Sequence, residues 1–469
     1  MLVGIIGGGL CGLATARRAL ELGADVELFE REASTGGMAS SLRAGELTFD
    51  LGPHTLYAGN PEIVRDIRGL LDGRLREVTP ERGIWRQSRL YQFPFHLGDF
   101  VRTSGLQGAW LPLLRYVTAR VTDRLNGPAE PASLEEWAVR RFGRPLYEFY
   151  VRDHVTKNVG LSPTALPALW GRQRIRIPDL TEAAAQLMGR AAPPRVSYYP
   201  EHGIGRIPGA LTTAVTRRGG RISTGTPVVG WARTPDGIEL DTGTGARARV
   251  RKVDVVVNTG PLDSFLLRAR NDSVPPEVTE AARRLTYRST VFVYVSTDDR
   301  RAQMPCDLCY FPEPAQIFSR VYSPSGYSEH CGGPSRTGFC FEIHCDPDDA
   351  LWKETDAALA HRTVAEAGTV PFFGFPDRLR VEAVVRVRRH YPLADPSSDA
   401  LRTVDRFLDS SAPRIISAGR LGSHRYVNMD SAMLMGTAAA EAAFGSGTAA
   451  DIRRIADTPQ FVETGRARR

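Results

Sequence analysis

The sequence contains little lysine and no long apolar run, and each absence excludes a class of protein. No stretch reaches the roughly eighteen apolar residues of a transmembrane helix, so stable membrane insertion is not expected. Only Lys157, Lys252 and Lys353 are lysines, so the net charge of +7 comes from arginines spread along the chain. Without a basic stripe or recognition motif, nucleic acid is not an expected partner. The N-terminus lacks a basic segment and cleavage site, which makes the cytoplasm the expected compartment.

Cysteine is also sparse, and its distribution raises the question of a metal. Five of the six cysteines lie between Cys306 and Cys345, and Cys306 and Cys309 have the spacing of a zinc knuckle, with His330 and His344 nearby. A single such pair is more typical of thiols that pack as small apolar side chains. We therefore expect no bound metal, and structural zinc is the alternative.

The order of apolar patterns predicts several packed units within the 469 residues. Residues 2–30 have the pattern of strand, glycine-rich turn, helix and strand. Residues 60–195 are mostly helical in pattern, with a capping-box start at Ser133. Short strands follow from residue 221, and residues 290–296 and 338–344 alternate as antiparallel strands do.

The glycine-rich turn has the spacing of a dinucleotide cradle. Gly7 permits a tight turn, Gly9 lets the backbone approach a pyrophosphate, and Gly12 allows close packing of helix on strand. The following amides, which begin at Leu10 and Cys11, face the phosphates. Glu30 ends the second strand, where its carboxylate can accept hydrogen bonds from ribose hydroxyls.

A second glycine pair favours FAD over NAD as the dinucleotide. The run Glu30 to Gly37 resembles the second glycine signature of the FAD-binding oxidoreductases, in which Gly36 and Gly37 let the chain pass close to the cofactor. Met38 stands where many proteins of that superfamily carry arginine. FAD is therefore the predicted cofactor.

Later motifs resemble UDP-galactopyranose mutase and its flavin-dependent relatives. They are Asp50–His54, Phe93–Leu97, Ser133–Tyr147, Tyr391–Pro392 and Gly419–Asp430. The last run is long and specific, and it is similar to the family's C-terminal flavin-contacting segment. The resemblance extends from about residue 3 to residue 445, with a loose match in the middle.

The resemblance implies site residues. His54 would lie against the flavin ring, and further cofactor contacts would come from Val228, Gly419, Arg420, Asn428 and Met429. Arg320 and Arg174 would grip a substrate diphosphate, with Arg172 and Arg176 as rivals of Arg174, and Tyr391 would complete the grip. A guanidinium fork suits this role because it binds phosphate oxygens bidentately.

The sequence departs from that family at the nucleotide base. The mutase carries a tyrosine and a tryptophan that pack on uracil, and by position these are His154 and Val159 here. Loss of both platforms removes about 1–3 kcal/mol of base stacking. The substrate is therefore not expected to be strictly UDP-galactopyranose.

Two reactions remain open. The resemblance implies a mutase that uses reduced FAD to interconvert the pyranose and furanose forms of a nucleotide sugar through a flavin N5–sugar adduct. The alternative is an oxidase or desaturase like the protoporphyrinogen oxidase and amine oxidase relatives, which share the cradle. A flavin-loaded, non-catalytic sensor that uses the cysteines is a third reading.

We expect an α/β fold with a Rossmann-like FAD-binding domain, a helical cap and an antiparallel-sheet substrate domain. The predicted segments are 1–60, 200–285 and 385–450 for the FAD domain, 61–199 for the cap, 286–384 for the substrate domain and 451–469 for a flexible tail.

The sequence does not fix the oligomeric state, and a homodimer is one of the options. Leu111–Leu114 and Val117 form an apolar helix face that either packs within the cap or docks on a membrane.

Overall fold

The computed structural model of the chain describes residues 1–57, 59–125, 131–175, 182, 185, 186, 188, 196–299, 302–373, 379–393, 398–410, 412 and 414–458, without the side chains of residues 124, 169, 173 and 174.

A parallel sheet of five strands, in the order β10-β2-β1-β14-β20, forms the centre of the first unit. Its strands are β1 (Leu2–Ile6), β2 (Asp25–Phe29), β10 (Arg221–Ser223), β14 (Val255–Asn258) and β20 (Ile415–Ser417). In β14, Val255 and Val257 join one hydrophobic cluster and Val256 joins another. Both faces of the sheet are therefore buried, as the apolar runs in the sequence predict.

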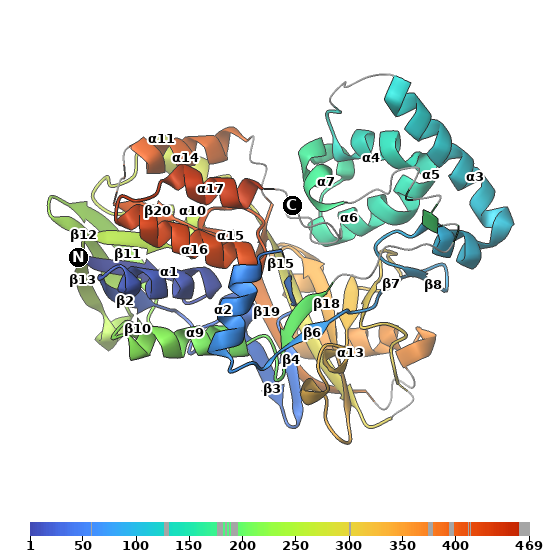
Figure 1. Cartoon of the computed structure of the whole chain (residues 1–469), viewed down its shortest axis with the longest axis horizontal. Helices are drawn as coiled ribbons and strands as arrows, with labels where there is room; N and C mark the ends of the chain where they lie inside the picture. The colour runs from blue at the N-terminus through green and yellow to red at the C-terminus, as the bar shows by residue number, and fades with distance from the viewer. Residues whose placement is uncertain are drawn as a thin grey trace.

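Helices cover one face of this sheet and a small antiparallel sheet packs on the other. On the first face α1 (Leu10–Glu21) lies beside α16 (Met429–Ala443) and α9 (Arg206–Arg217) (Figure 1). The second cluster contains residues from these elements: β11 (Val228–Thr234), β12 (Gly237–Thr242), β13 (Arg249–Val253), α10 (Leu262–Leu267), α11 (Pro276–Arg283) and α14 (Asp399–Ser410). This arrangement confirms the predicted α/β class.

A seven-stranded mixed sheet forms the second unit, in the order β19-β15-β18-β17-β16-β7-β8. Its strands are β7 (Arg82–Arg86), β8 (Arg89–Gln92), β15 (Tyr287–Thr297), β16 (Leu308–Tyr310), β17 (Arg320–Tyr322), β18 (Thr337–Cys345) and β19 (Arg380–Pro392). β15 and β18 pair antiparallel, as the alternation in the sequence predicts, and Thr290 stands opposite His344. Helices α12 (Ala350–Lys353) and α13 (Asp356–Ala367) belong to this unit.

The helices between residues 97 and 174 form a separate lobe at the upper right of Figure 1. They are α3 (Leu97–Leu125), α4 (Leu134–Phe142), α5 (Arg144–Tyr147), α6 (Asp153–Val159) and α7 (Ala168–Arg174). The Ser133 side chain accepts a hydrogen bond from the Glu136 amide at 3.2 Å, so α4 begins at the predicted cap. α3 is interrupted at Gly105, whose φ is +72°.

The predicted helical span 61–199 begins too early. Residues 82–92 are strands of the seven-stranded sheet, and α2 (Pro61–Leu70) lies against α9. Flanking residues form a small sheet of β5 (Leu56–Tyr57), β9 (Ser197–Pro200) and β6 (Leu75–Val78), beside a hairpin of β3 (Ser41–Ala44) and β4 (Leu47–Asp50). These strands pair with distant partners, which a local helical pattern does not reveal.

The expected tail also needs correction. Helix α17 (Ala449–Asp457) occupies the start of the span 451–469, and its Thr448 and Asp451 form a capping box. Arg425 is buried and pairs with Asp457 at 3.1 Å, which ties the helix to the body of the protein. Residues 459–469 lie outside the described part of the chain.

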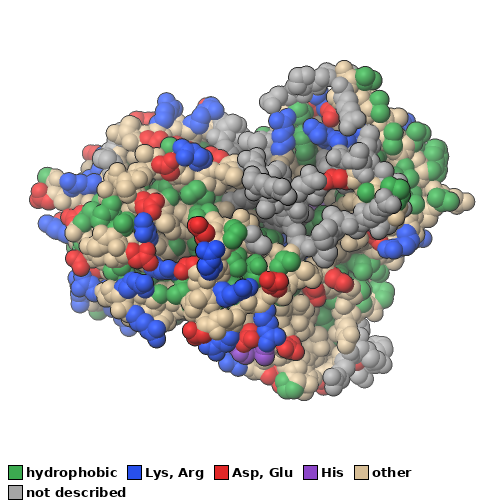
Figure 2. Space-filling model, in the orientation of Figure 1, with side chains coloured by type: hydrophobic (Ala, Val, Ile, Leu, Met, Phe, Trp, Pro, Cys, Tyr) green, Lys and Arg blue, Asp and Glu red, His purple; other side chains and the backbone are tan. Residues whose placement is uncertain are grey.

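The apolar face of α3 points largely to solvent instead of packing within the cap. Leu106 and Trp110 are 80% and 60% exposed, and Leu111, Leu114 and Val117 are each more than 40% exposed. Hydrophobic side chains accordingly gather over the right-hand part of the helical lobe (Figure 2). None of the described helices is both long and apolar enough to cross a membrane.

Replacing Gly436 with alanine is expected to lower the free energy of unfolding by about 1–3 kcal/mol. A Cβ there would stand 2.3 Å from the Cys11 carbonyl oxygen, so α16 would have to move away from α1. Gly209→Ala on α9 is the control, because a Cβ at that position meets nothing within 4 Å. Urea unfolding followed by circular dichroism measures both variants, and equal midpoints would contradict the prediction.

Candidate active site

The glycines in the turn between β1 and α1 are required for different structural reasons. Gly7 has a φ of +100°, and a Cβ on Gly12 would lie 2.0 Å from the Gly7 carbonyl oxygen, so the helix begins directly against the turn. A Cβ on Gly9, in contrast, meets nothing within 4 Å. No side chain caps the N-terminus of α1, and its first turn carries no acidic residue. The helix therefore presents amides to open space, an arrangement that suits an anion.

Glu30 lies beside this turn and holds it in place. Its Oε2 accepts a hydrogen bond from the Gly8 amide at 2.6 Å, and its Oε1 accepts one from the Glu32 amide at 2.8 Å. The side chain is buried. Each carboxylate oxygen has a second lone pair, so Glu30 can still accept a ribose hydroxyl.

The second glycine pair lies against the first. The Gly36 amide donates to the Gly8 carbonyl at 2.8 Å, and Gly36 and Gly37 have φ values of +125° and +54°. Met38 is half-buried beside them. Val228 begins β11 in the hydrophobic core, and its carbonyl accepts from Arg268 at 2.8 Å.

The C-terminal segment meets the start of α1. Gly419 has a φ of +79°, and a Cβ there would lie 2.8 Å from the Cys11 Cβ, so no larger residue fits without displacement. Arg420 is the second residue of α15 (Gly419–Gly422), and its Nε and Nη2 donate to the Val427 carbonyl at 3.0 and 2.8 Å. Asn428 is the N-cap residue of α16, and Met429 is its first residue. The second predicted cofactor segment is thereby brought to the first.

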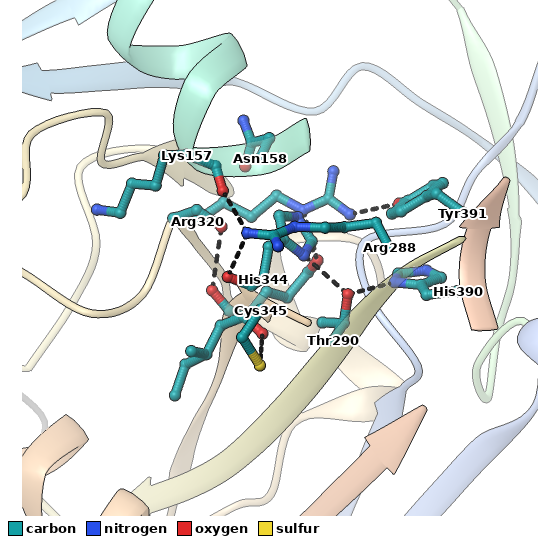
Figure 3. Close-up of polar contacts among 12 residues, drawn as sticks. Lys157, Asn158, Arg288, Thr290, Arg320, His344, Cys345, His390 and Tyr391 are labelled. Atoms are coloured by element: carbon teal, nitrogen blue, oxygen red, sulfur yellow. Dashed lines mark hydrogen bonds and ion pairs between the residues drawn. The ribbon is translucent and has the colours of Figure 1, made fainter. Parts of the chain in front are cut away.

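Arg320 and Tyr391 form a polar pair between the sheet and the helical lobe (Figure 3). Arg320 Nη2 donates to the Tyr391 hydroxyl at 3.0 Å, and Arg320 Nε lies 2.7 Å from the Glu342 carboxylate. The Tyr391 ring stacks on Tyr426 with centroids 5.7 Å apart, and the Arg420 guanidinium lies over both rings. The structure thus brings Arg320, Tyr391 and Arg420 together.

His54 carries no charge at neutral pH. Burial and the positive charges of Arg420 and Arg320 lower the pKa of His54 to about 3. Its Nδ1 is buried and has no hydrogen-bond partner among the described residues. A buried, unsatisfied nitrogen of this kind is the feature expected where a ligand supplies the missing partner.

A cavity of about 220 Å³ lies between the seven-stranded sheet and the helical lobe. Arg320, His344, Tyr391 and Arg288 line it from the sheet side. The lobe side is apolar and aromatic, and includes Phe95, Phe142, Val151, Val155, Val159 and Trp170. The cavity therefore joins a basic end to a hydrophobic wall.

His154 and Val159, which replace the mutase aromatics, lie on α6 in this wall. Burial and the charges of Arg320 and Lys157 lower the pKa of His154 to about 4, so it is neutral. Lys157 points the other way and donates to the Phe311 and Glu313 carbonyls at 2.6 and 2.7 Å, which fastens α6 to the sheet unit.

The second predicted arginine is only partly described. Arg174 is the last residue of α7, and its side chain lies outside the described part of the structure, as does Arg176 altogether. Arg172 is exposed. The neighbours Trp170 and Ile175 line the cavity, so this helix end borders it.

Sequence reasoning missed Arg288, which lines the cavity, and Thr290 and His390, which are buried behind it, and it named His344 only as a candidate metal ligand. Arg288 is buried, lies 2.6 Å from Asp346 and donates to the His344 carbonyl at 3.0 Å. These residues come from β15, β18 and β19, which are neighbours only after folding. A signal was available in principle, because polar residues interrupt otherwise apolar strands.

All six cysteines are free thiols in the protein interior. Cys306 and Cys309 lie in the core of the seven-stranded sheet, and burial raises the pKa of the Cys309 thiol well above its ordinary value. His330 packs on His202 instead, with centroids 4.9 Å apart. Across the described ranges, no three His, Cys, Asp or Glu side chains are grouped so as to hold a metal ion.

Comparison with known proteins identifies the family. The model of the flavin-containing amine oxidoreductases matches residues 10–443. The chain belongs to that family. It is therefore an FAD-dependent enzyme of the flavin-containing amine oxidoreductase family.

The fold is similar to that of reduced UDP-galactopyranose mutase, with a TM-score of 0.82, 19% identity and coverage of 97% of this chain and 98% of the other. A segment of 184 residues is 24% identical to protoporphyrinogen oxidase 2 of Arabidopsis thaliana, covering 37% of this chain and 36% of the plant protein. A segment of 67 residues is 34% identical to 4,4'-diapophytoene desaturase of Staphylococcus aureus and covers 14% and 13% of the two chains. The chain thus aligns with about a third or less of the length of these two curated relatives.

The residues present fit FAD. The open space in front of Gly9, the buried carboxylate of Glu30 and the unsatisfied Nδ1 of His54 are each placed where a ligand can complete them. The amides of α1 would hold the diphosphate, Glu30 the ribose, and the segments around His54 and Gly419 the flavin end. Bound flavin supplies redox or nucleophilic chemistry that the side chains lack.

Gly9→Val is expected to fold normally and to hold FAD at least about tenfold more weakly. Gly9 has the extended φ and ψ of −73° and −179°, which valine adopts without strain, but the side chain would enter the space in front of α1. Gly69→Val on α2 is the control, since its Cβ meets nothing within 4 Å. Circular dichroism checks the fold and flavin fluorescence titration measures binding. A folded Gly9→Val protein with full FAD content would place the cofactor elsewhere.

Proposed function

We propose that this enzyme, with its FAD reduced, catalyses a mutase-type interconversion of pyranose and furanose rings in a nucleotide-activated sugar. The observation that carries the proposal is the Arg320–Tyr391 pair at the basic end of the cavity. Departure and return of a nucleoside diphosphate require donors that hold it while the sugar rearranges. A cavity lined by an arginine and a tyrosine hydroxyl offers them.

The hydrogen bond between these two side chains directs the free hydrogen of Tyr391. Arg320 Nη2 donates to the tyrosine oxygen, so the tyrosine O–H has to donate to something else. Tyr391 lines the cavity, and a phosphate oxygen there would accept this hydrogen. Arg320 and Tyr391 would thus act on the same diphosphate group.

Basic residues outnumber acidic ones around this end of the cavity. Glu342 balances Arg320, but in the described residues Arg420 makes no ion pair and its Nη1 is buried without a hydrogen-bond partner. The charges of Arg420 and Arg320 both lower the pKa of His54. An anionic substrate or cofactor group would offset this excess of positive charge, which supports a diphosphate.

A second candidate is an oxidase or desaturase, and the apolar wall on the lobe side favours it. An aliphatic or polycyclic substrate would bury its surface against Phe142, Val151 and Trp170. The partial matches to protoporphyrinogen oxidase 2 and diapophytoene desaturase point in the same direction. The basic end of the cavity has no evident task when the substrate of such a reaction is an uncharged polyene or an amine.

A panel of nucleotide sugars offered to the FAD-loaded enzyme, with and without dithionite, separates the two candidates. Ring isomerisation that requires reduced flavin supports the mutase, and nuclear magnetic resonance of the sugar products detects it. Peroxide formed from a porphyrinogen, polyene or amine would establish the oxidase instead and end the mutase proposal.

Arg320→Lys is expected to weaken the binding of nucleoside diphosphates by about 10- to 100-fold. Lysine keeps a positive charge beside Glu342, but one ammonium group cannot hold Glu342, Tyr391 and a phosphate as the guanidinium fork can. Isothermal titration with UDP and dTDP measures the affinity.

The control for this variant is Arg425→Lys. Arg425 is likewise buried and paired with an acid, Asp405, at 2.7 Å, but it does not line the cavity. The control should bind diphosphates as the wild type does. Undiminished affinity in Arg320→Lys would remove Arg320 from the substrate site.

A further inference from the structure

Three buried side chains form a hydrogen-bonded chain that leads inward from the cavity (Figure 3). Thr290 Oγ lies 2.8 Å from His344 Nδ1 and 2.7 Å from His390 Nδ1. Thr290 is fully buried, and His344 and His390 are 7% and 1% exposed. The three residues come from adjacent strands β15, β18 and β19, so the sheet itself fixes their spacing.

The two ends of this chain face different surroundings. His344 lines the cavity, and its Nε2 lies 3.9 Å from the Glu342 carboxylate. At the other end, His390 Nε2 is buried and has no hydrogen-bond partner among the described residues. His54 is close enough to His390 to affect its pKa, and His54 Nδ1 is unsatisfied as well. A ligand accounts for His54 Nδ1, and exchange of a proton with the same site accounts for His390 Nε2.

The hydroxyl group decides how the two imidazoles are protonated. A neutral imidazole has one N–H and one lone pair, and a hydroxyl has a single hydrogen. Thr290 can therefore donate to one Nδ1 while it accepts from the other. In that arrangement the two histidines are opposite tautomers, and exactly one of their two Nε2 atoms carries a hydrogen.

We propose that His344, Thr290 and His390 form a proton relay between the substrate cavity and the cofactor site beside His54. A proton released by the substrate binds at His344 Nε2, and the hydrogen on His344 Nδ1 passes to the Thr290 oxygen. The Thr290 hydrogen passes to His390 Nδ1, and the hydrogen on His390 Nε2 passes to an acceptor lone pair in the cofactor site, on the bound flavin or on His54 Nδ1. His344, Thr290 and His390 each gain one proton and lose one, so all three stay neutral, and the reverse sequence delivers a proton to the cavity.

The surroundings keep both imidazoles neutral, as the relay requires. Burial lowers the pKa of His344 well below its ordinary value, and the charges of Arg320, Arg288 and Lys157 and the nearby His154 add to this effect. Burial also lowers the pKa of His390, with contributions from His344, Arg420, Arg320 and His54. Glu342 is the acidic group that faces His344.

The relay does not depend on which of the two reactions the enzyme catalyses. Reclosure of a sugar ring moves a hydroxyl proton, and oxidation of a substrate releases one, so in either reaction a group beside the substrate has to take up or supply a proton. His344 would be the catalytic residue, and Thr290 and His390 would carry the proton between it and the cofactor site.

The tautomers can be measured without any substrate. Nitrogen-15 labelling of the nine histidines in the FAD-loaded protein, assigned with His344→Gln and His390→Gln, gives the protonation of each ring nitrogen. The relay predicts that one of the two Nδ1 atoms, at His344 or at His390, carries a hydrogen and the other does not. If the two arrangements exchange rapidly, the averaged nitrogen chemical shifts of the two Nδ1 atoms should deviate in opposite directions. Thr290→Val should abolish this relation. The same state at both Nδ1 atoms would overturn the proposal, whatever the enzyme's substrate.

Turnover provides the second measurement once a substrate is known. Thr290→Val should lower kcat at least about tenfold with KM unchanged, and Thr290→Ser should restore it because serine keeps the hydroxyl. Thr363→Val removes another fully buried threonine hydroxyl, bonded to the Leu359 carbonyl at 2.7 Å, and should retain wild-type kcat. Wild-type kcat in Thr290→Val, or failure of Thr290→Ser to restore it, would refute the relay.

Discussion

The nucleotide-binding unit depends on close contact between the start of α1 and three other backbone segments. A Cβ at Gly12, Gly419 or Gly436 would collide with the β1 turn or with Cys11, so glycine at these positions lets a strand turn, the C-terminal segment and α16 converge on one helix end. Gly9 is the exception, because it faces open space. The close packing that requires glycine inside the protein thus leaves the amides at the N-terminus of α1 uncovered on the side of Gly9. An anion can reach them there.

Local signals account for the parts that the sequence predicted well. The strand, turn and helix of residues 2–30 lie within one short stretch, and each glycine there has a conformational or steric reason that can be stated from spacing alone. The pair Gly36 and Gly37 and the run beginning at Gly419 carry equally specific patterns. Arg320 and Tyr391 were predicted from the resemblance to UDP-galactopyranose mutase, and they lie within hydrogen-bond distance of each other in the structure.

The parts that could not be predicted depend on pairing between distant segments. Residues 82–92 join the seven-stranded sheet through β16, which is more than 200 residues further along the chain, and no local pattern specifies that partner. Thr290, His344 and His390 each resemble an ordinary polar residue in a strand, and only the strand order makes them neighbours. The solvent-facing side of α3 is a related case, since an apolar stripe does not tell whether anything covers it.

Charge connects the substrate end of the cavity to the histidines behind it. Arg320 and Arg420 lower the pKa of His54 and His390, and Arg320 also lowers that of His344, so the excess positive charge that favours an anionic ligand also keeps the imidazoles neutral. A bound diphosphate would offset part of that charge and raise these pKa values. Burial is nevertheless the largest cause of all three shifts, and it persists when the ligand binds. The histidines can therefore remain neutral, and able to exchange protons through Thr290, while the cavity is filled.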